Sequence, residues 1–325
     1  MSTVPIIDIA PYLHGNAADK AAVAAAVDEA CRNIGFLVIE GHAVSADIID
    51  AMYESAAAYF ALPFWEKMRL KMPPDRYRGY TPYGAETLAL SLDDATPPDI
   101  KESFSIGPFE HAYDAYHFGE QGSRFFAPNM WPMRPELMQS VWQTYYSEMT
   151  RLAGALMRIF ALALDMPETW FDDKVDRHIT NFSAIHYPAQ SEAPSTEQLR
   201  AGAHTDYGSL TIVHTNTDVG GLEVQDQSGA WSLVPIVPGT FVVNLGDLMA
   251  EWTNDRWVST MHRVANPPRD RAEQAKTSLL FFHQPNYDGV VECVPTCTGP
   301  DNPPRYSKTT SGEHVTAKIN KHREL

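Results

Sequence analysis

The sequence contains few cysteines, and the three that it has suit neither disulfides nor a metal knuckle. An odd number of cysteines cannot be fully paired. The segment Cys293-Val-Pro-Thr-Cys297 has one residue too many between its thiols for a CxxC pair, and Cys31 is distant in the sequence from both. These observations argue against a disulfide scaffold and a zinc knuckle, and they predict reduced thiols in a cytoplasmic protein.

The chain also lacks an excess of positive charge. Its 25 lysine and arginine residues stand against 41 aspartate and glutamate residues, so the formal net charge is 25 − 41 = −16. Nucleic-acid phosphates and anionic membrane surfaces attract proteins of the opposite sign. We therefore expect no nucleic-acid partner and no membrane partner, whereas a small-molecule partner fits the charge.

No long apolar run is free of charged residues. The N-terminal segment, MSTVPIIDIAPYL, has no basic residue before its apolar positions and contains Asp8, which argues against a signal peptide. The most apolar segment, Met149–Met166, carries Arg151 and Arg158 and has apolar residues at helical spacing. It therefore predicts a buried helix and not a membrane span.

The first third of the chain contains two helix patterns and then a long stretch rich in proline, glycine and aromatic residues. Helices are predicted at Asp19–Asn33 and after Ser45, which is a good N-cap, and short strands at Val4–Ile9 and Phe36–Ile39. Residues 64–135 read as irregular connections with one strand at Glu102–Ile106. Long ordered loops are often functional, so this stretch could form one wall of a substrate cavity or simply wrap the surface.

After the predicted helix at Met149–Met166, short β-rich segments alternate with turn residues. They are Asn181–Tyr187, Leu210–Thr215, Leu222–Gln225, Trp231–Ile236, Thr240–Leu245, Ser259–Val264 and Ser278–Phe282. Such spacing favours a β-sandwich or barrel over βαβ units. With the helices, the fold class is α+β. No flexible linker is present, so residues 1–135 and 136–325 are expected to pack as one compact unit. The sequence has no coiled coil or other obvious element for oligomer assembly, and a monomer is therefore slightly favoured.

A possible metal site is formed by His204, Asp206 and His262. In an extended strand, residues two apart point the same way and lie about 7 Å apart. Two imidazoles and one carboxylate on one face of an octahedral ion leave three positions open, as in non-haem Fe(II) oxygenases. An isolated HxD is often incidental, however, and a zinc hydrolase can use the same ligand types.

Other polar residues could serve a ligand carboxylate. Lys276 and Ser278 lie two apart, hence on one strand face, and the hydroxyl of Tyr187 could donate to the same group. A solvated strand end would explain the Lys276–Ser278 pair equally well. His214 and His283 stand in apolar strands and are expected to be core residues.

Several aromatic residues could line a pocket or belong to the core, and the sequence leaves both readings open. They are Tyr80, Tyr83, Phe104, Trp131 and Trp252.

Many short segments, in the same order, resemble the isopenicillin N synthase-like branch of the Fe(II)/2-oxoglutarate-dependent dioxygenases. They are Val4-Pro-Ile-Ile-Asp8, Gly35-Phe-Leu-Val-Ile39, Gly41-His42, Arg78-Gly-Tyr80, Lys101-Glu-Ser-Phe104, Asn129-Met-Trp-Pro132, His186-Tyr-Pro188, Gly202-Ala-His-Thr-Asp-Tyr-Gly208, Val219-Gly-Gly-Leu-Glu-Val224, Asn244-Leu-Gly-Asp247, Trp252-Thr-Asn254, His262-Arg-Val264 and Phe282-His-Gln-Pro-Asn286. The resemblance covers nearly the whole chain.

The resemblance implies a double-stranded β-helix, or jelly-roll, core with flanking helices and an N-terminal helical extension. It also implies Fe(II) held by His204, Asp206 and His262, with 2-oxoglutarate as cosubstrate, O2 as oxidant and ascorbate as reductant in vitro. The reaction expected from it is oxidation of an unactivated C–H bond of a small molecule, in the first place hydroxylation, with release of succinate and CO2.

One position departs from the family pattern. An Arg-x-Ser motif grips the distal carboxylate of 2-oxoglutarate in the family, and here it reads Lys276-Thr277-Ser278. Lysine keeps the charge but lacks the two-pronged fork of arginine. Lys276, Ser278 and Tyr187 could still bind 2-oxoglutarate, or the pocket could hold a substrate carboxylate, as in isopenicillin N synthase, a 2-oxoglutarate-independent oxidase and cyclase. An ethylene-forming activity and a non-catalytic binding protein of the same fold are further alternatives.

Overall fold

The computed structural model describes residues 4–92, 96–191, 194–195, 197–217, 219 and 221–323. The α-helices are α1 (Ala10–His14), α2 (Ala17–Asn33), α3 (Ala46–Phe60), α4 (Phe64–Met68), α5 (Ala115–Phe118), α6 (Gly122–Phe125), α7 (Met138–Ala163), α8 (Asp172–Val175), α9 (Asp247–Trp252) and α10 (Ser311–Arg323). The 3-10 helices are η1 (Leu88–Leu92), η2 (Arg269–Arg271) and η3 (Pro295–Cys297). The strands are β1 (Ile6–Asp8), β2 (Phe36–Glu40), β3 (Gly79–Thr81), β4 (Glu102–Ile106), β5 (Asn181–Tyr187), β6 (Ala201–His204), β7 (Leu210–Thr215), β8 (Leu222–Gln225), β9 (Trp231–Leu233), β10 (Phe241–Leu245), β11 (His262–Val264), β12 (Lys276–His283), β13 (Val290–Val291) and β14 (Thr309–Thr310).

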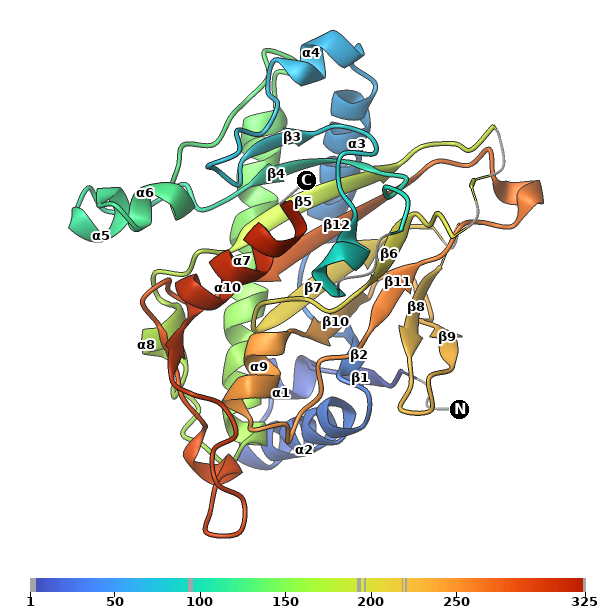
Figure 1. The fold of residues 1–325 in the computed structure, drawn as a ribbon. Helices are drawn as coiled ribbons and strands as arrows, with labels where there is room; N and C mark the ends of the chain where they lie inside the picture. Colours follow the sequence, from blue (N-terminus) through green and yellow to red (C-terminus); the bar gives the residue numbers. More distant parts are fainter. Residues whose placement is uncertain are drawn as a thin grey trace.

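Two sheets form the scaffold of the site. The larger has eight strands in the order β1-β2-β10-β7-β12-β5-β4-β3, and the smaller has four in the order β6-β11-β8-β9. Helix α7 runs behind the larger sheet, whereas α10 lies in front of it (Figure 1). The arrangement is the expected α+β fold with a jelly-roll core.

The larger sheet has one apolar face and one face with both polar and apolar side chains, because successive side chains of a strand point to opposite faces. Phe182 of β5 and Phe281 of β12 belong to the hydrophobic core. Ser183, Tyr187 and Ser278 belong to the same two strands but point to the other face, where they line a cavity. The same strands therefore stabilise the fold and build the site.

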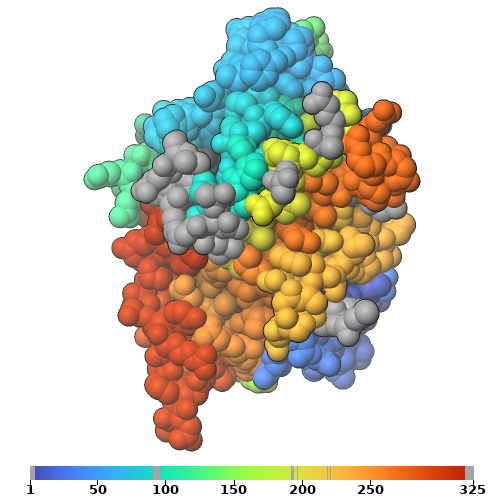
Figure 2. Space-filling view, turned by 45° about the vertical axis from the view of Figure 1, so that its right-hand side comes forward, coloured from blue at the N-terminus to red at the C-terminus, as the bar shows by residue number. Residues whose placement is uncertain are grey.

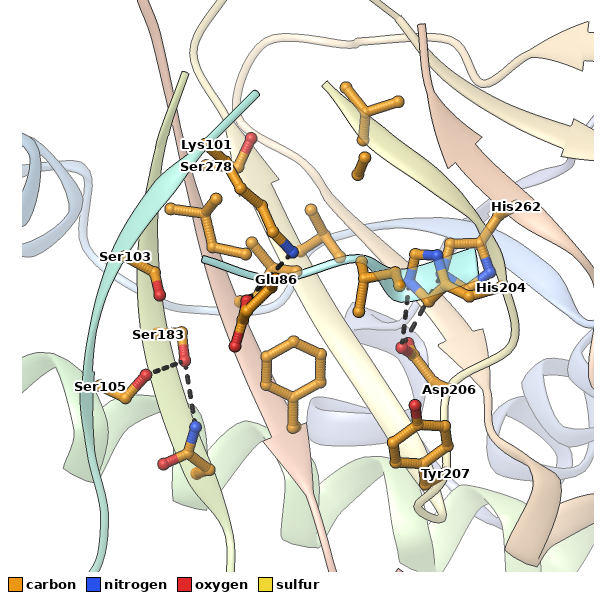
Figure 3. Close-up of a pocket in the computed structure, with 18 of the residues that line it drawn as sticks. Glu86, Lys101, Ser103, Ser105, Ser183, His204, Asp206, Tyr207, His262 and Ser278 are labelled. Carbon is orange, nitrogen blue, oxygen red and sulfur yellow. Dashed lines mark hydrogen bonds and ion pairs between the residues drawn. The ribbon is translucent and has the colours of Figure 1, made fainter. Parts of the chain in front are cut away.

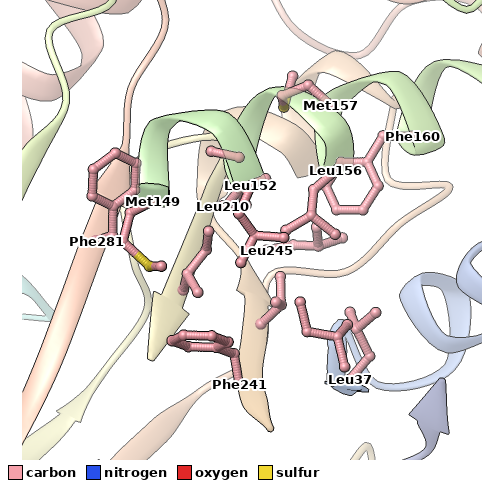
Figure 4. Close-up of a cluster of buried hydrophobic side chains, with 14 of the residues drawn as sticks. Leu37, Met149, Leu152, Leu156, Met157, Phe160, Leu210, Phe241, Leu245 and Phe281 are labelled. Atoms are coloured by element: carbon pink, nitrogen blue, oxygen red, sulfur yellow. The ribbon is translucent and has the colours of Figure 1, made fainter. Parts of the chain in front are cut away.

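The main hydrophobic core lies between the larger sheet and helix α7. Buried residues of α7 recur at helical spacing, among them Trp142, Tyr145, Met149, Leu152 and Leu156. Figure 4 shows Met149, Leu152 and Leu156 facing side chains of β2, β7, β10 and β12. The predicted helix at Met149–Met166 exists, but it begins earlier, since its first turns bury aromatic residues that a search for the most apolar segment overlooks.

The N-terminal predictions are confirmed with small shifts in their bounds. Helix α2 covers Asp19–Asn33, and the Ser45 hydroxyl caps α3 by accepting a hydrogen bond from the Asp47 amide at 3.2 Å. Between α2 and β2 the chain turns at Gly35, whose φ is +62°. A Cβ there would lie 2.1 Å from the Val258 carbonyl oxygen, so only glycine fits.

Two predictions on secondary structure were wrong. Residues 64–135 contain β4 as expected, but also α4, β3, η1, α5 and α6. These elements have three to five residues, too few for a periodic pattern to reveal them. Strand β6, with the sequence AGAH, was expected only as an extended segment at His204 and Asp206 and not among the β-rich segments, because alanine and glycine are poor strand formers and this strand depends on pairing with β11.

Strands from both halves of the sequence share the larger sheet. Strands β1 to β4 precede residue 135, and β5, β7, β10 and β12 follow it. A domain boundary at residue 135 stays a prediction. Among the residues that the structure describes, no helix is both long enough and apolar enough to cross a membrane.

The packing of α7 predicts a large effect of truncating its buried face. Leu156 is fully buried, so Leu156→Ala should lower the free energy of unfolding by about 2 to 5 kcal/mol. Chemical denaturation measures the change. Ser147→Ala, on the exposed side of the same helix, is the control and should change it by less than about 0.5 kcal/mol. A Leu156→Ala variant as stable as the control would contradict the described core.

Candidate metal centre

His204, Asp206 and His262 come together at one end of the smaller sheet. His204 ends β6, and His262 begins β11 directly opposite it in the antiparallel pairing. The Asp206 Oδ1 atom lies 3.9 Å from His204 Nε2 and 3.8 Å from His262 Nε2. Asp206 follows β6 in a loop, so the expectation that it continues the strand was wrong, although it faces the same point as His204.

Backbone carbonyls orient both imidazoles. His204 Nδ1 lies 2.8 Å from the Gly202 carbonyl oxygen, and His262 Nδ1 lies 3.0 Å from that of Thr260. A neutral imidazole that donates from Nδ1 keeps its Nε2 lone pair free for a metal. Both rings therefore aim their Nε2 atoms at the space beside Asp206.

The Asp206 carboxylate is held by its other oxygen. Oδ2 accepts hydrogen bonds from Thr211 Oγ1 at 2.5 Å and from Asn244 Nδ2 at 2.7 Å. These donors come from β7 and β10 of the larger sheet. The larger sheet thus fixes the carboxylate, while the smaller sheet supplies both imidazoles.

The protonation states suit a cation. Burial is the main cause that lowers the pKa of His204 to about 3, and the adjacent His262 is the second. Burial raises the pKa of Asp206, but the two imidazoles and the hydrogen bonds from Asn244 and Thr211 outweigh it and leave the pKa below its usual value. The centre therefore offers a neutral imidazole and a carboxylate near pH 7.

The donor set fits a divalent metal ion. The candidate ligand atoms all lie within 4.8 Å of one another, and in the described part of the chain no other group of histidine, cysteine, aspartate or glutamate meets this description. Two nitrogens and one oxygen would bind an ion from one side only, so its coordination positions toward the cavity would stay open. Such a facial set suits Fe(II) better than the closed tetrahedron of structural zinc.

The cavity beside the three residues has a volume of about 240 Å³ and lies between the two sheets. In the space-filling view, the cyan atoms of the first third of the chain, the gold atoms around residues 222–233 and the red atoms of the C-terminal segment are on one face (Figure 2). Residues 72 to 125 contribute Met72, Tyr77, Arg78, Thr81, Glu86, Leu88, Lys101, Ser103, Ser105 and Phe125 to its lining. The hypothesis that this stretch forms a cavity wall is therefore confirmed.

Lys276, Ser278 and Tyr187 also lie on the cavity wall. Lys276 is directly opposite Tyr187 in the pairing of β12 with β5, and all three residues are buried. The structure thus brings together the side chains that the sequence singled out for a carboxylate.

A polar chain on β4 and β5 was not identified from the sequence. The hydroxyls of Ser105 and Ser183 are 2.7 Å apart, Asn181 donates to Ser183 at 3.0 Å, and Arg78 donates to Asn181 at 3.1 Å. The signal was the alternation of small polar residues in ESFSI and NFSAIHY, which shows one strand face to be polar. Glu86 and Lys101, also missed, line the same cavity and lie between this polar chain and His204, Asp206 and His262, which we call the triad (Figure 3).

Comparison with known proteins gives consistent matches across the chain. A family model described as the 2OG-Fe(II) oxygenase superfamily matches residues 178–285, and one described as the N-terminal part of a non-haem dioxygenase in morphine synthesis matches residues 4–134. A homoarginine-6-hydroxylase of Oryza sativa subsp. japonica is 32% identical over 331 residues, which cover 97% of this chain and 96% of the relative. The chain belongs to the 2OG-Fe(II) oxygenase superfamily.

Other relatives agree with this assignment. The validamycin A dioxygenase of Streptomyces hygroscopicus subsp. limoneus is 32% identical to this oxygenase, over 90% of this chain and 79% of the relative. A full-length Neurospora crassa protein, solved in complex with alpha-KG and thymine, has a TM-score of 0.86 at 28% identity, covering 98% of this chain and 96% of that chain. Alpha-KG is 2-oxoglutarate.

Membership of the family confirms several expectations. The protein is an Fe(II)- and 2-oxoglutarate-dependent oxygenase of the isopenicillin N synthase-like branch, with O2 as oxidant and a jelly-roll core. It oxidises a small molecule, with succinate and CO2 as coproducts. The predicted class of enzyme and its cofactors are thereby established.

The remaining candidates of the oxygenase belong to the core or the surface. His214 Nδ1 lies 2.9 Å from the Tyr53 hydroxyl, and His283 Nδ1 lies 2.7 Å from that of Ser209, so both are core residues as expected. The aromatic residues that the sequence left open between pocket and core do not line the cavity. Tyr80, Phe104 and Trp252 are buried in the core, Trp131 packs against it, and Tyr83 is exposed.

Buried histidines make the stability of the metal-free oxygenase depend on pH. Burial lowers the pKa of His283 to about 3 and that of His214 and of His178 to about 4. In the unfolded chain they titrate near 6.5, so as the pH falls from 7 to 5.5 the unfolded state binds protons that the folded state does not. The free energy of unfolding should fall by about 1 kcal/mol for each histidine.

Denaturant titrations of the metal-free protein at pH 7 and pH 5.5 measure this dependence. A His214→Gln variant, which lacks one of the titrating groups, should show a smaller decrease. A free energy of unfolding that stays constant or rises toward pH 5.5 would contradict the neutral state of these histidines in the fold.

Proposed function

We propose that His204, Asp206 and His262 hold the Fe(II) of this oxygenase. The observation that carries the proposal is that three potential ligand atoms converge within 4.8 Å, beside a cavity. Their hydrogen bonds leave both Nε2 atoms and Asp206 Oδ1 directed at one point. Fe(II), with 2-oxoglutarate and O2, supplies an oxidant for C–H bonds.

We further propose that Lys276, Ser278 and Tyr187 bind the carboxylate of 2-oxoglutarate distant from its 2-oxo group. A carboxylate without solvent needs several donors, preferably one with a charge. Lys276 supplies the charge, and the hydroxyls of Ser278 and Tyr187 supply neutral donors on the same sheet face. Burial raises the pKa of Tyr187 to about 12, so its hydroxyl keeps the proton it would donate.

The primary substrate is proposed to be a small polar molecule that is hydroxylated. Support comes from the hydrogen-bonded chain of Ser105, Ser183 and Asn181 on the cavity wall, which would orient polar groups of a substrate. The relatives named above are a homoarginine hydroxylase, a validamycin A dioxygenase and a protein solved with thymine. A screen of polar small molecules for succinate above the uncoupled background tests this class.

A cytoplasmic location is also proposed. Cys31, Cys293 and Cys297 are free thiols in the structure, which suits a reducing compartment. Fractionation of cells that express a tagged chain tests the location.

Loss of one imidazole should remove the metal. His262→Ala leaves two ligands, so bound Fe(II) measured after anaerobic loading and desalting should fall at least tenfold, and succinate formation with it. His14→Ala, at an exposed position, is the matched control and should bind one equivalent of metal like the wild type. Full metal binding by the His262→Ala variant would refute the ligand assignment.

Replacement of Lys276 should affect 2-oxoglutarate selectively. Lys276→Ala removes the cation of the proposed anchor and should raise the KM for 2-oxoglutarate at least tenfold, because hydrogen bonds to charged groups contribute about 1.5 to 3 kcal/mol. Lys276→Arg keeps the charge, so its KM for 2-oxoglutarate should equal that of the wild type or be lower. Succinate formation that is unchanged in Lys276→Ala at low 2-oxoglutarate would rule out this anchor.

A further inference from the structure

Lys276 of β12, Tyr187 of β5 and Lys101, which directly precedes β4, form one row. Lys276 pairs with Tyr187 between β12 and β5, and Glu102 pairs with His186 between β5 and β4. Lys101 directly precedes β4, and extending the β4–β5 register by one residue places it opposite Tyr187. Cross-strand neighbours share a sheet face, and all three side chains of the row line the cavity. Two lysines therefore flank the tyrosine of the proposed anchor.

Lys101 is buried but only loosely paired. It is 5% exposed, and its Nζ atom lies 3.4 Å from Glu86 Oε2 and 3.5 Å from Asp99 Oδ2. Charge-assisted hydrogen bonds between an ammonium and a carboxylate are about 2.7 to 2.9 Å long. The ammonium of Lys101 therefore retains capacity to donate to a closer carboxylate.

The carboxylate of Asp99 already serves the backbone. It accepts from the Gly202 amide at 2.9 Å and from the Leu88 amide at 3.2 Å, and so ties η1 to β6. Asp99 is therefore fixed by the fold and not by Lys101. Figure 3 shows Lys101 and Glu86 beside each other in the cavity. The strands that carry Ser103 and Ser278 lie on one side of them, and the triad lies on the other.

Lys67, another buried lysine, has the close ion pair that is typical of a structural role. Lys67 Nζ donates to Glu102 Oε2 at 2.7 Å and to the Phe60 carbonyl oxygen at 3.2 Å. Glu102 belongs to β4 but points away from the cavity, because it is adjacent to the cavity-lining residues Lys101 and Ser103. Lys67 is thus closely paired on the core side of the same sheet and serves as a matched control.

We propose that Lys101 is a second cation for the distal carboxylate of 2-oxoglutarate and acts together with Lys276. The inference rests on the function proposed above, since it needs 2-oxoglutarate to lie against Tyr187. A single ammonium lacks the fixed, two-pronged geometry with which arginine binds a carboxylate. Two lysines, one on each side of Tyr187 in the register, can approach both carboxylate oxygens from different directions.

Equilibrium binding to the Fe(II)-loaded, anaerobic protein tests the proposal without turnover. Isothermal titration calorimetry gives the Kd of 2-oxoglutarate and of 2-oxopentanoate, which has the same five carbons and 2-oxo acid end but no distal carboxylate. Lys101→Met should raise the Kd of 2-oxoglutarate at least tenfold and change that of 2-oxopentanoate by less than about threefold. Lys101→Arg keeps the charge and should bind 2-oxoglutarate more tightly than Lys101→Met.

The control and the contrary results are equally defined. Lys67→Met should leave both dissociation constants within about twofold of the wild type. The proposal is overturned if Lys101→Met binds 2-oxoglutarate like the wild type, or if it weakens both ligands alike. A Lys101→Met variant with normal 2-oxoglutarate binding and a raised KM for the primary substrate would overturn it too, by assigning Lys101 to the substrate.

A second variant serves if Lys101→Met does not fold. Glu86→Gln removes one carboxylate that competes for the ammonium of Lys101, so the Kd of 2-oxoglutarate should fall at least twofold while that of 2-oxopentanoate is unchanged. An unchanged or raised Kd of 2-oxoglutarate contradicts the proposal. Failure of the wild type to bind 2-oxoglutarate would overturn the proposed anchor as well, whereas a normal wild type with an unaffected Lys101→Met overturns this inference alone.

Discussion

The pairing of β6 with β11 is the contact on which the candidate metal centre depends. It places His204 opposite His262, and each ring is then oriented by a carbonyl two residues before it. The AGAH sequence of β6 favours a strand only weakly. Asp99 compensates for this, since it binds the Gly202 amide and so fixes the start of the ligand strand. A buried carboxylate outside the triad thus supports its geometry.

The larger sheet connects stability with chemistry through its two faces. One face packs against α7 and makes the main hydrophobic core, whereas the other carries hydroxyls, amides and ammonium groups into the cavity. Asn244 and Thr211 of this sheet also hold the Asp206 carboxylate. A rigid sheet is well suited to this task, because metal and cosubstrate groups must be placed within a fraction of an ångström.

The sequence revealed the elements whose local pattern is strong. Strands β5, β7 and β8 have the predicted bounds, since β-branched or apolar residues between turns mark them clearly. The candidate metal ligands and the candidate carboxylate-binding residues Lys276, Ser278 and Tyr187 were predicted from spacing and resemblance, and the structure brings the members of each set together. Lys101 and Glu86 were missed because their position depends on strand register and on a loop of the first half, which no local pattern specifies. The sequence left the aromatic residues open between pocket and core, since large aromatic residues serve cores as readily as sites.

The central claim is that this chain binds Fe(II) through one face of three side chains and leaves room for a chelating 2-oxo acid. The most direct measurement is an anaerobic titration of the metal-free wild type with Fe(II) and then 2-oxoglutarate, followed by visible absorption. Our account predicts one equivalent of Fe(II) and a new charge-transfer band that saturates at one equivalent of 2-oxoglutarate. Stoichiometric metal binding without any such band would contradict it.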